Sequence, residues 1–258
     1  MYKRAYCNDT RKEKFNIREF MKVNVVCMKW GDKYGPEYVN KLYSMVKRNM
    51  TIPYNFICIT DDASGIRKEV KIQPIPEIKV PSKNDVSPWR KLLMFSSKLG
   101  GIKGKTLFLD LDIVIIENID CFFSYSDNFS IIENWTQKGR GIGNSSVYLF
   151  EFGKYEYVLK EFIENMDEIL KKYDNEQIYL SKRIPNIKFW PETWCKSFKI
   201  HCLPGGLKNL FITPRIPEGT KIVVFHGNPK PSDAIVGKWP GTIRKFVRKT
   251  PWVEKYWC

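Results

Sequence analysis

The chain has 258 residues, of which 43% are hydrophobic and 14% aromatic, and this suffices for the core of one large domain or two small ones. The formal net charge of +15 predicts an anionic partner, such as nucleic acid, an acidic membrane surface or a phosphate-bearing substrate. The sequence holds no apolar run of about 18 residues, which excludes a membrane-spanning helix, and the basic N-terminus lacks the apolar segment of a secretory signal.

Composition distinguishes three parts of the chain. Residues 1–21 are mostly polar and charged and form a short N-terminal arm, whereas residues 22–237 carry the apolar periodicity of a folded domain. Residues 238–258 mix lysine and arginine with aromatic residues, and we expect a basic, aromatic C-terminal tail. Seven cysteines with scattered spacing favour reduced thiols, and therefore a cytoplasmic protein, in a host cell if its source is a virus.

The folded domain opens with a strand-helix-strand pattern. Residues 23–28 read as a buried strand, residues 36–48 as a helix with one apolar face, and residues 54–60 as the next strand. This order implies a parallel sheet, which binds ligands at the carboxyl ends of its strands. Tyr34 and Asp61 follow the first and second strands, so we expect both side chains at that edge.

Proline and a cap residue mark the next segment. Residues 70–81 are rich in proline and read as an extended connection. Ser87 and Pro88 have the residue types of an N-cap and a first helical position. A cation near a helix N-terminus is unfavourable for the helix dipole, so Lys91 in this first turn indicates another partner, such as a phosphate.

Residues 106–118 form an apolar, β-branched run that contains Asp110 and Asp112. We expect one strand, in which alternation would place both carboxylates on the same face. Buried carboxylates need a partner, and a divalent cation with oxygen ligands is one solution. Exposure to water, or a salt bridge to one of the many lysines, is the other.

Beyond this strand the elements are less regular. Residues 190–204 are aromatic and read as irregular, and residues 155–173 read as one long amphipathic helix. The other expected elements are strands at 129–132, 144–150 and 221–226, and a helix that is capped by residues 174–177 and runs to residue 181.

Short motifs run through the domain in a fixed order. After the first strand-helix-strand unit come Trp-Arg-Lys at 89–91, Phe-Leu-Asp-Leu-Asp at 108–112, Asn-Ser-Ser-Val at 144–147, Glu-Gln at 176–177 and Phe-His-Gly-Asn-Pro-Lys-Pro at 225–231. This order resembles a GT-A-fold glycosyltransferase of family 8 or a related type, over residues 22–240. The resemblance implies a single α/β, Rossmann-like domain with a central, mostly parallel sheet flanked by helices.

The resemblance also implies a metal site. In such enzymes the two aspartates and the histidine of the late motif bind a divalent ion, and the matching residues here are Asp110, Asp112 and His226. Carboxylate oxygens with one imidazole suit Mn²⁺, or Mg²⁺, better than Ca²⁺. His226 is one of only two histidines in the chain.

Donor binding and catalysis are assigned in the same way. The implied donor-binding residues are Tyr34 and Asp61 for the uracil and ribose, Lys91, Asp110 and Lys230 for ribose, sugar or phosphate, Asn144 and Ser145 for the sugar, and Gly227 for close backbone approach. Glu176 and Gln177 match the pair beside the anomeric carbon, and with Asp110 they are the implied catalytic residues. Here the pair follows Asn175, where many relatives have Gly-Asp-Gln, so the sequence leaves open which of the two faces that carbon.

The implied function is a metal-dependent hexosyl- or pentosyltransferase that moves a sugar from a UDP-sugar to an acceptor hydroxyl with retention of configuration. Two acceptors remain open. The basic, aromatic tail fits hydroxymethylated DNA of the phage type, and it equally fits a bacterial surface glycolipid or polysaccharide reached from the inner membrane face. A solvated, lysine-rich surface would also explain the charge.

Two other classes of protein use similar features. A non-catalytic nucleic-acid-binding protein on the same scaffold would have no need of Asp112 and His226, which are both present. A metal-dependent nucleotidyltransferase also sets two carboxylates on a strand, but it usually carries an early glycine-rich phosphate loop, and the glycines between 31 and 35 are too sparse for one.

Overall fold

The structure is a computed structural model, which describes residues 22–77, 87–241 and 245–258. The expected N-terminal arm at 1–21 and the end of the proline-rich connection lie outside the described residues. No helix in the described part is long and apolar enough to cross a membrane. The six cysteines that it contains form no disulfide.

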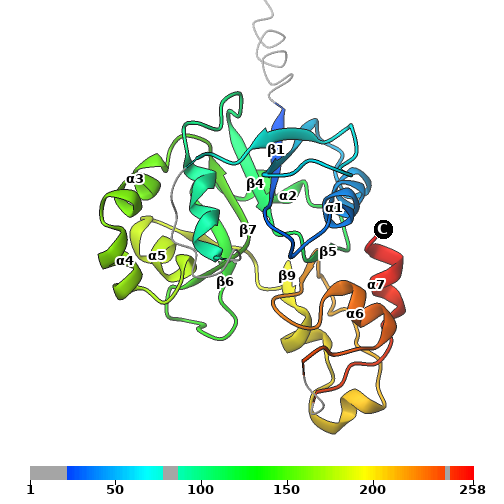
Figure 1. Cartoon of the computed structure of the whole chain (residues 1–258). Helices are drawn as coiled ribbons and strands as arrows, with labels where there is room; N and C mark the ends of the chain where they lie inside the picture. Colours follow the sequence, from blue (N-terminus) through cyan, green and yellow to red (C-terminus); the bar gives the residue numbers. More distant parts are fainter. Residues whose placement is uncertain (1–21, 78–86, 242–244) are drawn as a thin grey trace, which may run out of the picture.

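A seven-stranded sheet forms the centre of the molecule (Figure 1). Its strands are β1 (Val23–Lys29), β2 (Tyr54–Thr60), β3 (Lys71–Pro74), β4 (Lys105–Leu109), β6 (Ser130–Glu133), β7 (Gly143–Glu151) and β8 (Lys188–Phe189). They lie in the order β3-β2-β1-β4-β7-β6-β8, and only the two pairs that β7 makes, with β4 and β6, are antiparallel. The expected mostly parallel sheet is therefore confirmed.

Helices cover both faces of this sheet (Figure 1). On β1, Val25 and Cys27 belong to one core cluster, which includes the apolar face of α1 (Pro36–Asn49). Val26 and Met28 point the other way, because side chains alternate along a strand. Val26 and Met28 belong to a second core cluster. This cluster also contains residues of the 3-10 helix η1 (Pro88–Phe95) and of the α-helices α3 (Glu156–Glu164) and α5 (Glu176–Arg183).

The first strand-helix-strand unit forms as the sequence predicts. β1 and β2 pair in parallel from Val23 opposite Tyr54 to Lys29 opposite Thr60. Between them, α1 starts with Pro36 in its first turn and buries Leu42 and Val46 against the sheet. The loop that carries Tyr34 therefore starts at the carboxyl end of β1.

The expected single strand at 106–118 is wrong. β4 ends at Leu109, the chain turns at Asp110 to Asp112, and β5 (Ile113–Ile115) begins in a different sheet. That second sheet has the order β5-β10-β9, with β9 (Cys195–Ser197) and β10 (Ile222–Val224). Residues 106–109 and 113–115 are both buried, so burial does not distinguish the end of one strand from the start of the next.

Four other expectations need correction. The long helix at 155–173 is two helices, α3 and α4 (Met166–Lys172), separated by Asn165. The segment after Ser87 is a 3-10 helix, and the Ser87 side chain makes no cap hydrogen bond. The proline-rich connection contains the edge strand β3, and the irregular segment at 190–204 contains β9 and the turn η2 (Phe198–Cys202).

The C-terminal part forms a smaller lobe next to the second sheet (Figure 1). It contains η3 (Gly206–Leu210), α6 (Pro231–Val236) and α7 (Pro251–Tyr256), whereas α2 (Cys121–Tyr125) lies in the main body near β4. The end of the chain does not project into solvent, because Val247, Val253 and Trp257 are buried in the same core cluster as α1. Arg48 of α1 also donates hydrogen bonds to the backbone carbonyls of Tyr256 and Cys258.

Candidate active site

A cavity of about 200 Å³ lies where β1 and β4 end and β7 begins. This is the edge at which a parallel sheet binds ligands. Among the residues expected to act, the cavity is lined by Tyr34, Lys91, Asp110, Asp112, Asn144, Ser145, Glu176, Gln177, His226 and Gly227. The turn between the two sheets carries both aspartates, the start of β7 carries Asn144 and Ser145, and the chain after β10 carries His226 and Gly227.

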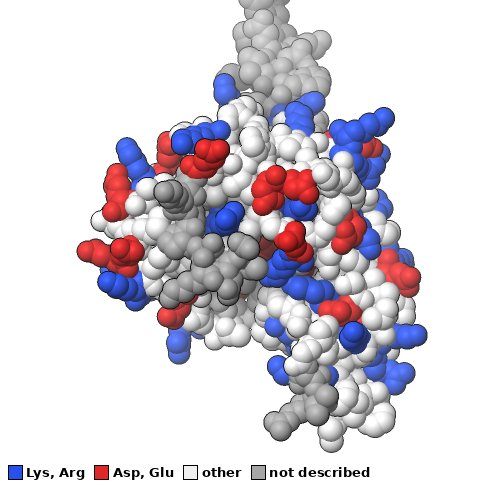
Figure 2. Space-filling view, in the orientation of Figure 1, with Lys and Arg blue, Asp and Glu red and all other residues white. Residues whose placement is uncertain are grey.

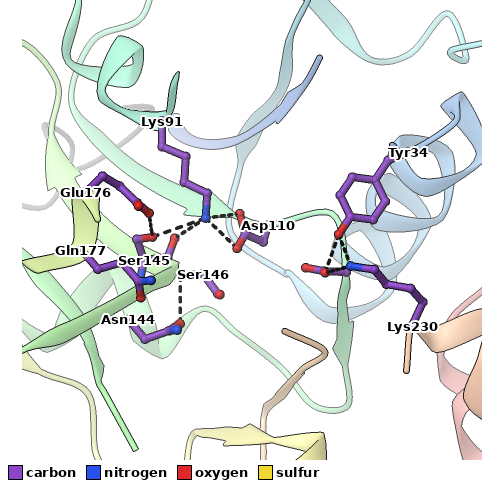
Figure 3. Close-up of polar contacts among 10 residues, drawn as sticks. Tyr34, Lys91, Asp110, Asn144, Ser145, Ser146, Glu176, Gln177 and Lys230 are labelled. Carbon is purple, nitrogen blue, oxygen red and sulfur yellow. Dashed lines mark hydrogen bonds and ion pairs between the residues drawn. The ribbon is translucent and has the colours of Figure 1, made fainter. Parts of the chain in front are cut away.

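One polar network fills the side of the cavity next to the main sheet (Figure 3). The Lys91 Nζ lies 2.7 Å from Asp110 Oδ1 and donates to Asp110 Oδ2 at 2.8 Å. Ser145 Oγ donates to Glu176 Oε1 at 2.7 Å, and the Ser145 backbone N–H donates to Gln177 Oε1 at 3.1 Å. The start of α5 is thereby fixed against the start of β7.

Burial controls the protonation of this network. Glu176 is 1% exposed, and its second carboxylate oxygen has no partner among the described residues. Burial raises the pKa of Glu176 and of Asp110, because the charged form is disfavoured, and the nearby Lys91 opposes both shifts. Burial also acts to lower the pKa of Lys91, but the carboxylates of Asp110 and Glu176 outweigh it and the pKa is raised.

A second network surrounds Asp112 and includes Tyr34 and Lys230, which are labelled in Figure 3. Tyr34 Oη donates to Asp112 Oδ2 at 2.6 Å, and Lys230 Nζ lies 2.7 Å from the same oxygen. Lys230 also donates to the Tyr34 hydroxyl. Burial, followed by the charge of Asp112, raises the pKa of Tyr34, so the phenol keeps its proton and remains a donor.

His226 faces the cavity from the smaller lobe. Its Nε2 lies 2.7 Å from Ser197 Oγ, and the Trp135 ring stacks on the imidazole with 5.5 Å between ring centroids. Burial, together with the charge of Lys199, lowers the pKa of His226 to about 4. The imidazole is therefore neutral at pH 7, which is the form that binds metal ions.

The expected metal ligands share the cavity but are not arranged around an ion. The described residues contain no group of three metal-ligating side chains that could hold one. Asp110 and Asp112 instead form salt bridges with Lys91 and Lys230, which was the other explanation of the paired aspartates. Two carboxylates and a neutral imidazole fit Mn²⁺ in kind, and Tyr34 and Lys230 both contact the same carboxylate oxygen of Asp112, Oδ2.

Asp61 lies at the expected edge of the sheet, directly after β2, but it is not among the residues that line the cavity. Its Oδ2 accepts a hydrogen bond from the Gly31 backbone N–H at 3.0 Å, so it shapes the loop that leads to Tyr34. The structure also adds Trp30 and Lys33, which line the cavity and were not predicted. Both follow the first strand, as Tyr34 does, and this position was the signal available in the sequence.

Comparisons with known proteins define the fold. No protein-family model and no curated protein matches the chain. Among solved structures, the galactosyltransferase LgtC in complex with donor and acceptor sugar analogues is similar with a TM-score of 0.56 and 13% identity, over 81% of this chain and 88% of LgtC. The glycosyltransferase GlyE of Streptococcus pneumoniae TIGR4 is similar with a TM-score of 0.60 and 15% identity, over 92% of this chain and 61% of GlyE.

A third similar structure, the bifunctional glycosyltransferase WbbM, has a TM-score of 0.53 and 12% identity, over 81% of this chain and 46% of WbbM. At such identities the likeness concerns the fold. The chain therefore has the mixed α/β fold of GT-A glycosyltransferases, with a seven-stranded central sheet flanked by helices.

Proposed function

We propose that the protein is a GT-A glycosyltransferase that moves a hexose or pentose from a UDP-sugar to an acceptor hydroxyl. The observation that supports this most is the cavity at the carboxyl edge of the parallel strands, where Asp110 and Asp112 occupy one turn among lysines from three other segments. Such a site offers charges of both signs, which suit a diphosphate and its counter-ion. The fold shared with glycosyltransferases and the order of motifs typical of family 8 support the same assignment.

The cavity-lining residues, together with Lys230 beside Asp112, divide into two groups that match the two halves of a sugar nucleotide. Tyr34 and Lys230, around Asp112, serve the nucleotide and its diphosphate in this proposal. Asn144, Ser145 and the Glu176–Gln177 pair serve the sugar, because they bring hydroxyl, amide and carboxyl groups to the opposite side of the cavity. Such groups hydrogen-bond to sugar hydroxyls.

We assign Mn²⁺, or Mg²⁺, to Asp110, Asp112 and His226, with Lys230 as the counter-ion of Asp112 before the ion binds. When bound, the ion supplies positive charge that stabilises the departing diphosphate. Lys230, which lies beside Asp112, would donate to a phosphate oxygen of the donor.

The reaction breaks the bond between C1 and the phosphate oxygen and forms a bond between C1 and the acceptor oxygen. The acceptor proton passes to the departing phosphate, so the chain need supply no nucleophile. Gln177 is fixed by its hydrogen bond from the Ser145 backbone and orients the sugar. Attack on the face that the phosphate leaves retains the configuration at C1, and NMR of the product tests this.

Thermal unfolding with Mn²⁺ and a panel of UDP-, GDP- and CMP-sugars tests the proposed function. A donor that binds only the folded protein should add about 2.7 kcal/mol to the free energy of unfolding at a hundredfold excess over its Kd. We expect this with a UDP-sugar, followed by slow hydrolysis to UDP and free sugar. Release of pyrophosphate would indicate a nucleotidyltransferase instead, and no stabilisation by any nucleotide sugar would contradict the proposal.

For the acceptor, we propose a glycolipid at an anionic membrane surface rather than DNA. Leu207 and Phe211 at η3 are 78% and 76% exposed, which is unusual for such large apolar side chains. The gold-coloured segment that contains η3 lies at the bottom of Figure 1. Figure 2, in the same orientation, shows mostly uncharged atoms there. Glu218 and Asp233 are the only acidic residues between 206 and 249, against many lysines and arginines. Apolar side chains within a basic lobe suit anionic lipid headgroups.

Flotation with vesicles tests the acceptor proposal. We expect binding to phosphatidylglycerol vesicles that weakens as salt increases, and at least tenfold weaker binding by the L207S/F211S variant, because about 0.8 kcal/mol is lost per CH₂ withdrawn from the membrane. The I72S/I163S variant is the control, since it removes two partly exposed apolar side chains elsewhere. Tight binding to hydroxymethylated DNA, with no preference for vesicles, would favour the DNA acceptor.

A further inference from the structure

Lys199 of the turn η2 lies next to Gly227, one of the residues that line the cavity. A Cβ atom built on Gly227 would stand 3.3 Å from Lys199 Nζ, so the ammonium packs closely beside this glycine. Gly227 itself lines the cavity. The sequence offered no signal for Lys199, because it lies in a segment that reads as irregular.

The ammonium of Lys199 has no acidic partner. Within the described residues it forms no salt bridge and donates no hydrogen bond, whereas Lys91 and Lys230 each lie 2.7 Å from a carboxylate oxygen. The charges on those two lysines are therefore balanced by aspartates of the same cavity, and the charge on Lys199 is not.

The surroundings of Lys199 are positively charged. Its side chain is partly buried, and burial lowers the pKa, followed by the charges of Lys245 and Lys230. Asp112 opposes this shift, which places Lys199 within electrostatic reach of the predicted donor site. A partly desolvated ammonium among other cations is stabilised when an anion binds beside it.

Gly227 makes room for such an anion. Its φ of 77° lies in a region that residues with a side chain rarely adopt. Any larger residue here would also meet the Lys199 ammonium. Lys230 follows Gly227 by three residues and approaches the same cavity through Asp112. The segment after β10 therefore runs between two lysines.

We propose that Lys199 is a diphosphate-binding residue of the donor site and, together with Lys230, holds the phosphate that leaves. This inference rests on the proposed function. As the bond between C1 and the phosphate oxygen breaks, negative charge grows on that phosphate. Lys199 keeps its proton and stabilises this charge as a hydrogen-bonded cation, independently of the metal ion.

Calorimetric titration of UDP, uridine and inorganic pyrophosphate into the full chain, with Mn²⁺ and with EDTA, tests the inference. The K199Q variant should bind UDP and pyrophosphate about 10- to 100-fold more weakly, since a hydrogen bond to a charged group contributes about 1.5–3 kcal/mol. Binding of uridine, which has no phosphate, should not change. The K199R variant should recover most of the affinity, and K171Q on the exposed face of α4 should bind as the wild type does.

Three outcomes separate the two proposals. Weaker UDP binding by K199Q alone, with an unchanged melting temperature and recovery in K199R, supports the role of Lys199. Equal UDP affinity in the wild type, K199Q and K199R overturns that role and leaves the proposed function standing. If the wild-type protein binds UDP no more tightly than uridine and does not bind pyrophosphate, both proposals are contradicted.

Discussion

Asparagine in place of Asp112 is expected to lower kcat/KM for sugar transfer by about 100- to 1000-fold, the range seen when one electrostatic contact to a transition state is removed. The Asp112 carboxylate accepts from Tyr34 and pairs with Lys230, and we assign it to the metal ion as well. Asparagine keeps the shape of the side chain but removes its charge. The variant would therefore bind the ion weakly and leave Lys230 without its counter-ion.

The measurement is release of UDP from a UDP-sugar, with the acceptor present and absent. The matched control is D167N, which makes the same change at an exposed position on α4 and should keep full activity. Full activity of D112N in a chelated buffer would show that the cavity is not the catalytic site. The melting temperature of D112N must stay close to that of the wild type for the comparison to be valid.

Methionine in place of Lys91 is expected to lower the free energy of unfolding by about 3 kcal/mol. The reason is that removal of Lys91 leaves the buried charge of Asp110 without a partner. The pair that Lys91 forms with Asp110 is well shielded, with side chains that are 13% and 19% exposed. In the variant, burial would raise the pKa of Asp110 without opposition from Lys91. The folded protein would then hold a proton that the unfolded chain releases, so the variant should be least stable near pH 7.5 and recover partly toward pH 5.5.

Urea unfolding in a chelated buffer at these two pH values measures the effect. The double variant K91M/D110L is the matched control, since removal of both charges should recover most of the lost stability. The exposed K98M variant should unfold as the wild type does. A loss of less than about 1 kcal/mol by K91M would mean that the pair is as weak as one on the surface.

The parts of the fold that follow from local sequence could be predicted. β1, α1 and β2 are set by periodicity, by Pro36 and by contacts close along the chain, and they form almost at the expected residues. The division between β4 and β5 could not be predicted, because both strands are buried and only their distant partners, β7 and β10, reveal the turn between them. Sequence pattern carries no information on which strand a buried segment pairs with.

The site shows the same division. The motifs pointed to most of the residues that line the cavity, some at strand ends and others, such as Lys91 and Glu176, in the first turn of a helix. They did not show that Lys91 would pair with Asp110 and Lys230 with Asp112. With so many lysines in the chain, the choice of partner depends on side-chain geometry in three dimensions. Lys199 was missed for the same reason, since the turn η2, between β9 and β10, brings it next to Gly227.

At Asp110 to Asp112 the chain passes from the main sheet to the second sheet. This passage also determines when the site can form during synthesis. β5 has no partner until β10 is synthesised, near the end of the chain, and β10 is followed directly by His226, Gly227 and Lys230. On the ribosome, the main sheet can therefore assemble first, with one half of the cavity open. The nascent protein would gain its ability to bind a donor only when β9 and β10 emerge and close the second sheet.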